Sequence, residues 1–347
     1  KPQVMTLIYP EPAASQRETK QGDTIYRPLG EVWLTHPKRR FYRGIELCPS
    51  ASEANPDYYN LWRGWGVEPE QKGNFAEGWP LFKEHILLVA QLDPEYARYI
   101  LSWMAHTVQH PQDPAGIALA TRGAPGTGKS TFARWFGALF GEHFLHLDSD
   151  QLLLGRFNAH LHNKICVLAD EAVWAGGKQG LGRLKRLVTE RTLTIERKGI
   201  DAITVKNMIH MIVASNEEWF IPTEEEDRRF AIFTISKKRQ NNHAFFSAVH
   251  DELFKHGGLA ALLHDLLHVD LSTLPPLHPI PKTKERDLQK DLTLSPQSEW
   301  WIDTLESGAM WTNDGDEQRL ERDALYENYS INVEHSQRRF SRGSRGA

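Results

Sequence analysis

The sequence contains little cysteine, with only Cys48 and Cys166 among 347 residues. It has no Cys-x-x-Cys pair and no cluster of cysteine and histidine at metal-ligand spacing, which argues against a disulfide framework and a zinc site. No apolar run reaches the ~18 residues of a membrane-spanning helix, and no signal-peptide pattern precedes the first domain. We therefore expect a cytoplasmic protein without a membrane partner.

An excess of positive charge is also missing. Lysine and arginine total 41 against 45 aspartates and glutamates, which gives a formal net charge of −4. Contact with a nucleic acid would therefore have to come from a local basic surface. Hydrophobic residues make up 40% of the chain, enough for a sizeable core in one large domain or two ordinary ones.

A glycine-rich loop stands between a strand-like run and a helix-like run in LATRGAPGTGKSTFARWFGALFG, residues 119–141. Such a loop directs several backbone N–H groups into one concavity, which favours a bound phosphate. The spacing G-x-x-x-x-G-K-S is that of a Walker A loop, in which Lys129 reaches the β and γ phosphates of ATP and Ser130 holds Mg²⁺. The residues expected to bind the nucleotide are Gly123, Ala124, Pro125, Gly126, Thr127, Gly128, Lys129, Ser130 and Thr131.

Acidic side chains follow the apolar run in KICVLADEA. A phosphate loop needs one carboxylate near Mg²⁺ and another that aligns the attacking water. We expect Asp170 to serve the metal and Glu171 to polarise the water. A strand that ends in acids is a common pattern, and its position downstream of the Walker A loop makes it more specific.

Two further candidates follow later strands. Asn216, at the end of the apolar run in MIHMIVASNEEWFIP, is suited to hydrogen-bond the γ-phosphate or the water, although asparagine at a strand end also forms turns. Arg228 and Arg229 come directly before the apolar run FAIFTI. Arginines in that position are usually surface residues, so their spacing alone assigns them no role.

The most basic stretch of this region is LGRLKRLVTERTLTIERKGIDAITVKNM, residues 181–208. It predicts a helix followed by two extended runs, with Lys198 and Gly199 at the tip of a hairpin and Arg197 beside them. Exposed Lys198 and Arg197 could contact the phosphate backbone of a nucleic acid. An ordinary solvated hairpin fits the same pattern.

Strand-like and helix-like segments alternate through the middle of the chain. Apolar runs typical of buried strands cover residues 116–122, 143–147, 164–169, 208–214 and 230–235. This alternation predicts an α/β fold with a mainly parallel five-stranded sheet flanked by helical segments.

Five segments are expected along the chain. Residues 1–75 form an irregular lead-in with short β-like pieces such as EVWLT, and residues 276–347 form a linker, predicted from four prolines in LPPLHPIPKTKERD, with a partial C-terminal region that has a helical pattern from residue 298. Between them lie a helical collar at 76–115, the P-loop ATPase core at 116–240 and the C-terminal helices of the ATPase domain at 241–275.

Together these motifs resemble those of superfamily 3 helicases, the helicases of viruses, phages and plasmids that are fused to or paired with primase-polymerase domains. The resemblance covers residues 61–284 and rests on GAPGTGKST, GRFNAHLHNKICVLADEAVWAGG, LKRLVTERTLTIERKGID, IVASNEEWFIP and DRRF, in that order. It implies an AAA+-like core that assembles into a ring, usually a hexamer, and translocates on single-stranded or forked DNA. It also implies a primase-polymerase domain in the same or a partner chain, and the host cell cytoplasm if a phage encodes the protein.

The resemblance also implies roles for single residues. It makes Asn216 the sensor of the nucleotide and Lys198 the DNA contact. Arg229 becomes an arginine finger for a neighbour's nucleotide, with Arg228 as the fallback because the doubled arginine leaves the register open. A winged-helix module is implied beyond DALYENYS, residues 323–330.

Other classes of P-loop protein fit less well. A regulatory GTPase needs an N-K-x-D element, and Asn163-Lys164 is followed by Ile165 and Cys166. A small-molecule kinase fits poorly too. A replication loader or scaffold that binds DNA and switches with nucleotide, without unwinding, stays open as the alternative to a helicase.

Overall fold

The computed structural model describes residues 14–18, 24–50, 52–70, 77–171, 178–221, 223, 227–293 and 301–302. The chain divides into two compact units, Lys1–Trp62 and Arg63–Ala347. The predicted tail helix from residue 298, apart from 301–302, and the implied winged-helix module fall outside the described residues. The five predicted segment boundaries remain predictions.

The first unit contains short elements. β1 (Ala14–Glu18) pairs antiparallel with β2 (Thr24–Pro28), and β3 (Gly44–Glu46) pairs parallel with β4 (Tyr58–Asn60). The EVWLT segment, expected to be β-like, belongs instead to helix α1 (Leu29–Thr35). That expectation is wrong because a short apolar run has the same appearance in a strand and in a helix, and no period separates the two.

The second unit is built on a five-stranded parallel sheet, which confirms the predicted α/β fold. Its strand order is β11-β5-β10-β7-β6, with neighbouring strands parallel throughout. The strands are β5 (Ala118–Arg122), β6 (Phe144–Leu147), β7 (Cys166–Asp170), β10 (His210–Ser215) and β11 (Phe230–Thr234). Every residue of β10 is buried, as expected for a strand covered on both faces.

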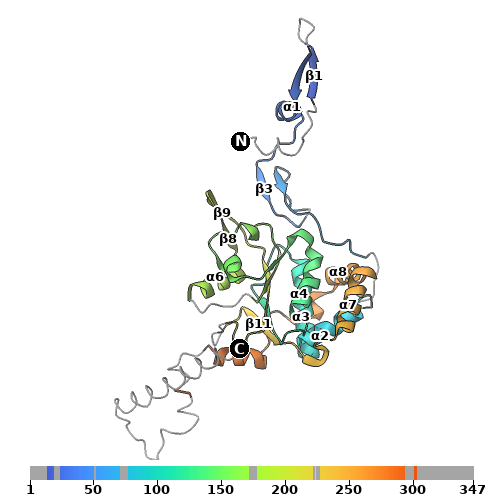
Figure 1. Cartoon of the computed structure of the whole chain (residues 1–347), viewed down its shortest axis with the longest axis vertical. Helices are drawn as coiled ribbons and strands as arrows, with labels where there is room; N and C mark the ends of the chain where they lie inside the picture. The colour runs from blue at the N-terminus through green and yellow to red at the C-terminus, as the bar shows by residue number, and fades with distance from the viewer. Residues whose placement is uncertain are drawn as a thin grey trace, which may run out of the picture. The chain divides into compact units, whose positions relative to one another are not determined.

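Helices cover both faces of this sheet (Figure 1). On one face, α4 (Lys129–Gly137) packs against β7 and β10, and Phe132 and Phe136 of α4 meet Phe82 of α2 and Trp103 of α3 with ring centroids 6.0 and 5.9 Å apart. The helices of this layer are α2 (Pro80–Val89), α3 (Pro94–Gln109), α7 (His243–Lys255) and α8 (Gly258–His268).

The opposite face carries α5 (Asp150–Leu154), α6 (Lys178–Thr189) and the antiparallel hairpin of β8 (Thr192–Arg197) and β9 (Ile200–Lys206) (Figure 1). Leu184, Leu187 and Val188 of α6 share a buried apolar cluster with residues of β5, β7, β10 and β11. Both faces of the sheet are therefore covered, and polar side chains lie at its carboxyl edge.

The stretch predicted to be a linker packs against helix α3. Ser102 Oγ donates to Pro275 O (2.7 Å) and Tyr99 Oη donates to Leu277 O (2.9 Å), and helix α9 (Lys284–Asp291) begins within the same stretch. Four prolines alone did not reveal this, because the carbonyl groups of a proline-rich chain can still accept hydrogen bonds from a neighbouring helix.

Candidate nucleotide-binding site

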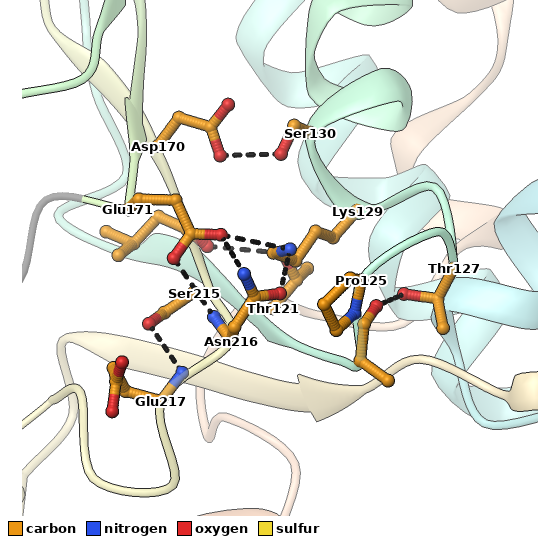
Figure 2. A network of polar contacts seen from close by, with 12 residues as sticks. Thr121, Pro125, Thr127, Lys129, Ser130, Asp170, Glu171, Ser215, Asn216 and Glu217 are labelled. Carbon is orange, nitrogen blue, oxygen red and sulfur yellow. Dashed lines mark hydrogen bonds and ion pairs between the residues drawn. The ribbon is translucent and has the colours of Figure 1, made fainter. Parts of the chain in front are cut away.

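The glycine-rich loop connects the carboxyl end of β5 to the first residue of α4. Gly126 and Gly128 have φ angles of +78° and +91°, a region that glycine enters at little cost. Space is short as well, because a Cβ on Gly126 would lie 1.9 Å from Asn241 Oδ1 and one on Gly128 would lie 2.5 Å from Phe246. Thr127 Oγ1 donates to Ala124 O (2.8 Å) and closes the loop (Figure 2).

Three side chains from three elements converge beside this loop (Figure 2). Lys129, from α4, is 8% exposed, and its Nζ lies 3.1 Å from Glu171 Oε1. Lys129 Nζ also donates to Asn216 Oδ1, and Asn216 Nδ2 donates to Glu171 Oε1. Glu171 follows β7 and Asn216 follows β10, so the parallel pairing of these strands brings the two side chains to one edge.

The backbone at Glu171 is in the left-handed region, with φ of +51°. A residue other than glycine rarely adopts this conformation, and such positions cluster at functional sites. The Glu171 N–H still donates to Ala214 O of β10 (2.8 Å). The chain therefore turns immediately after the sheet pairing ends, and the carboxylate points to Lys129.

Ser130 and Asp170 form a second pair of oxygen-bearing side chains (Figure 2). Ser130 Oγ donates to Asp170 Oδ1 (2.5 Å), and Asp170 Oδ2 lies 3.0 Å from His146 Nε2 of β6. Among the described residues no cluster of three or more histidine, cysteine, aspartate or glutamate side chains could cage a metal by itself. A hydroxyl with a single carboxylate fits Mg²⁺, which keeps several waters and takes its other ligands from phosphates.

The buried His85 and two less buried residues, Gln240 and Asn241, hold the backbone of the loop, and no sequence pattern pointed to them. His85 of α2 has its Nε2 3.1 Å from Gly128 O, and burial lowers its pKa to about 4. The ring is therefore neutral at pH 7, and its Nε2–H donates to the carbonyl. On the other side, Asn241 N donates to Gly126 O (3.0 Å) and Gln240 Nε2 donates to Pro125 O (2.9 Å). Pattern reasoning missed these residues, and His146, because each lies far from its partner along the chain.

Arg228 and Arg229 lie at the other edge of the sheet. They precede β11, whose first residue Phe230 pairs with Ala118 at the amino end of β5, whereas the phosphate loop follows Arg122 at the carboxyl end. At ~3.3 Å per residue the two ends of β5 are ~13 Å apart. Arg229 Nη1 lies 3.4 Å from Asp227 Oδ2 of its own segment, and Arg228 is exposed. The structure therefore does not bring either arginine to the glycine-rich loop of the same chain.

The predicted hairpin is present, with Lys198 and Gly199 at its tip between β8 and β9. Gly199 has a φ of +74°, as a tight hairpin turn requires. Arg197 and Lys198 are both exposed. Lys206, at the base of the hairpin, instead pairs with Asp113 at 2.9 Å.

Comparisons with known proteins place this site in context. Residues 121–229 match a family of unknown function (DUF5906), a range that begins within β5 and ends before β11. A DNA primase-polymerase of Nitratiruptor phage NrS-1 is 30% identical over 155 residues, which is 44% of this chain and 21% of that protein. The matched stretch is thus a small part of the relative's length.

Solved structures show a similar fold. An apo structure of the NrS-1 C-terminal region (305–718) superposes with a TM-score of 0.62 at 19% identity, over 90% of this chain and 79% of that one. The JCV helicase aligns with a TM-score of 0.35 and 16% identity over 66% of this chain and 65% of that one, too low to support an argument. No helix in the described ranges combines the length and apolar character needed to span a bilayer. The chain is homologous to part of the NrS-1 primase-polymerase and has the fold of that protein's C-terminal region.

Proposed function

We propose that this chain is an ATP-dependent, ring-forming DNA helicase or translocase of superfamily 3. It would act in DNA replication as the motor part of a primase-helicase of a phage, plasmid or other mobile element. The observation that carries the proposal is the convergence of Lys129, Glu171 and Asn216 beside the paired Ser130 and Asp170. A phosphate loop with both carboxylates in place has the groups that ATP hydrolysis needs.

Each side chain has a role in this proposal. Lys129 binds the β and γ phosphates, and Ser130 and Asp170 hold Mg²⁺, which neutralises charge on the phosphates. Glu171 orients the attacking water and Asn216 contacts the γ-phosphate or that water. Before ATP arrives, the Lys129 ammonium is balanced by Glu171. Phosphate oxygens would compete for Lys129 and leave the carboxylate free to accept from water.

A ring is supported by the position of Arg229. Because it stands at the edge of the sheet opposite to the phosphate loop of its own chain, it could complete only a site on a neighbouring copy. A composite site between copies closes into a ring when the same contact repeats with rotational symmetry. We favour a hexamer with Arg229 as the finger and Arg228 as the alternative.

DNA is the proposed track. The exposed Lys198 and Arg197 at the hairpin tip present positive charge in a form that suits a single-stranded phosphate backbone. Homology to a primase-polymerase supports a replication role. A primase-polymerase domain in the same or a partner chain is the corresponding partner, and single-stranded or forked DNA the substrate.

The decisive experiment compares ATP hydrolysis with and without single-stranded DNA, together with unwinding of a forked duplex. We expect DNA to stimulate hydrolysis and the fork to be unwound only when ATP can be hydrolysed. A Glu171→Gln variant supplies the background for both assays. DNA binding without stimulation or unwinding would instead indicate a nucleotide-switched loader or scaffold.

A further inference from the structure

Helix α9, with the sequence KERDLQKD, is unusually polar for a helix with buried residues. Leu288 is its only apolar residue, and a helix of this composition is expected to stand in solvent. Glu285 and Gln289 are nevertheless 4% and 0% exposed, and Arg286 is 8% exposed. Polar contacts must therefore account for its position.

Gln289 satisfies all four of its hydrogen-bonding positions within the protein. Its Oε1 accepts from the N–H groups of Phe220 (3.1 Å) and Ile221 (3.3 Å). Its Nε2 donates to Glu218 O (2.5 Å) and to Glu285 Oε1 (3.0 Å). One side chain thus holds the backbone of the segment that directly follows Asn216.

Neighbouring residues extend this contact along the same connection toward Arg229. Thr293 Oγ1 accepts from Trp219 Nε1 and from Thr223 N, both at 3.2 Å. Arg286 Nη2 donates to Asp227 O (2.7 Å), and Asp227 is the residue whose carboxylate pairs with Arg229.

The same helix also contacts Arg122, the residue directly before the glycine-rich loop. Glu285 receives Arg122 in a two-point ion pair, with Nε to Oε1 at 2.7 Å and Nη2 to Oε2 at 2.9 Å. Thr234 Oγ1 donates to this carboxylate as well. Arg122 is the last residue of β5, directly before Gly123.

We propose that α9 and the residues directly after it form a brace that fixes residues 218–221, 223 and 227 of the connection from Asn216 to Arg229, with Gln289 and Thr293 as the positioning residues. This connection leaves the carboxyl edge of the sheet at Asn216 and returns to the amino edge at Arg229. It therefore joins the residue that contacts the chain's own nucleotide to the arginine offered to the next copy. The inference rests on the proposed function, in which that arginine acts on a neighbouring copy.

The test uses variants that remove hydrogen bonds with little change in volume. Gln289→Met and Thr293→Val remove them, Thr293→Ser keeps the hydroxyl, and Asp287→Ala is the control on the exposed side of α9. We expect kcat to fall by ~10-fold to ~100-fold in Gln289→Met and Thr293→Val, because a misplacement of a catalytic group by ~1 Å can cost ~100-fold. Nucleotide affinity should stay near the parent value in all four, and Thr293→Ser and Asp287→Ala should keep kcat.

A mixing experiment tells whether the brace acts on the finger. A Gln289→Met subunit has an intact phosphate loop, and a Lys129→Ala subunit has an intact finger, so their mixed rings should recover activity above the sum of the separate proteins. Unchanged kcat in both Gln289→Met and Thr293→Val, or nucleotide affinity that falls together with kcat, would overturn the proposal. The reference is a mixture of Lys129→Ala with Arg229→Ala. If activity recovers only in the reference mixture, the brace is refuted, but the site shared between neighbouring copies is not. If the reference mixture also fails to recover activity, both are refuted.

Discussion

Asn216 Nδ2 donates to Glu171 Oε1 across the carboxyl ends of two neighbouring strands, and both side chains contact Lys129. The amide and the carboxylate are thus held together on the same ammonium group. We expect Lys129 to act mainly in ATP binding and Glu171 mainly in hydrolysis.

Lys129→Ala should weaken ATP binding, whereas Glu171→Gln should bind ATP and fail to hydrolyse it. The lysine contacts the phosphates in the ground state, while the carboxylate acts on the water in the transition state. Titration of an ATP analogue and steady-state hydrolysis would measure the two effects. Glu217→Gln, an exposed side chain at the same sheet edge, is the control and should hydrolyse normally. Equal loss of binding in the lysine and glutamate variants would remove Glu171 from the proposed role.

Lys198→Ala should reduce binding of single-stranded DNA to the same extent for different base sequences. A lost phosphate contact should lower the slope of log affinity against log salt by ~0.7. Lys206→Ala is a matched control. Lys206 belongs to the same hairpin, but its ammonium group pairs with Asp113. Binding titrations at several salt concentrations would measure the slope. If both variants bind as the parent does, the hairpin tip is not the DNA contact.

Arg229→Ala and Lys129→Ala should each be inactive and should restore hydrolysis when they assemble together. An arginine finger supplied by a neighbouring copy raises kcat by ~10³–10⁵. Mixed rings pair the intact loop of one variant with the intact finger of the other. The assay needs differently tagged subunits that co-purify. Co-assembly without recovery would mean that Arg229 does not act on its neighbour. The same mixture made with Arg228→Ala shows which of the two arginines reaches across.

His85 should make the protein less stable in acid. Its pKa is about 4 in the folded state against an ordinary value of 6.5, so only the unfolded chain binds a proton between these values. The contribution is fully present above pH 6.5 and is lost as the pH falls toward 4, by ~1.4 kcal/mol per pH unit within the window. Between pH 7 and pH 5 the parent should lose ~2 kcal/mol more of its free energy of unfolding than His85→Gln does.

Chemical denaturation at the two pH values would measure that difference. The His85→Gln variant would keep an N–H donor near Gly128 and lack the titrating group. Burial also lowers the pKa of His210, to about 3. Because His210 is present in both the parent and the variant, its contribution to the pH dependence is the same in both. Identical pH dependence in both would show that His85 has the same pKa in the folded protein as in the unfolded chain.

Sequence reasoning predicted the sheet well because its strands carry continuous apolar runs. All five predicted strands are present, and their ends move by at most two residues. The turn at Gly199 was also predicted, because glycine enters the positive-φ region at little cost, and its φ is +74°. The apolar run in EVWLT had no such marker, and it forms a helix.

Local composition and spacing were enough to predict the α/β fold, the glycine-rich loop between β5 and α4, and polar residues at the ends of β7 and β10. The order of the strands, the contacts of His85 and Asn241 with the loop backbone, and the position of Arg229 at the far edge of the sheet emerged only from the folded chain. The same is true of α9, which has no apolar stripe to announce its burial. These features depend on hydrogen bonds and ion pairs between segments distant in the chain, whose partners become adjacent only when the sheet order and register are set.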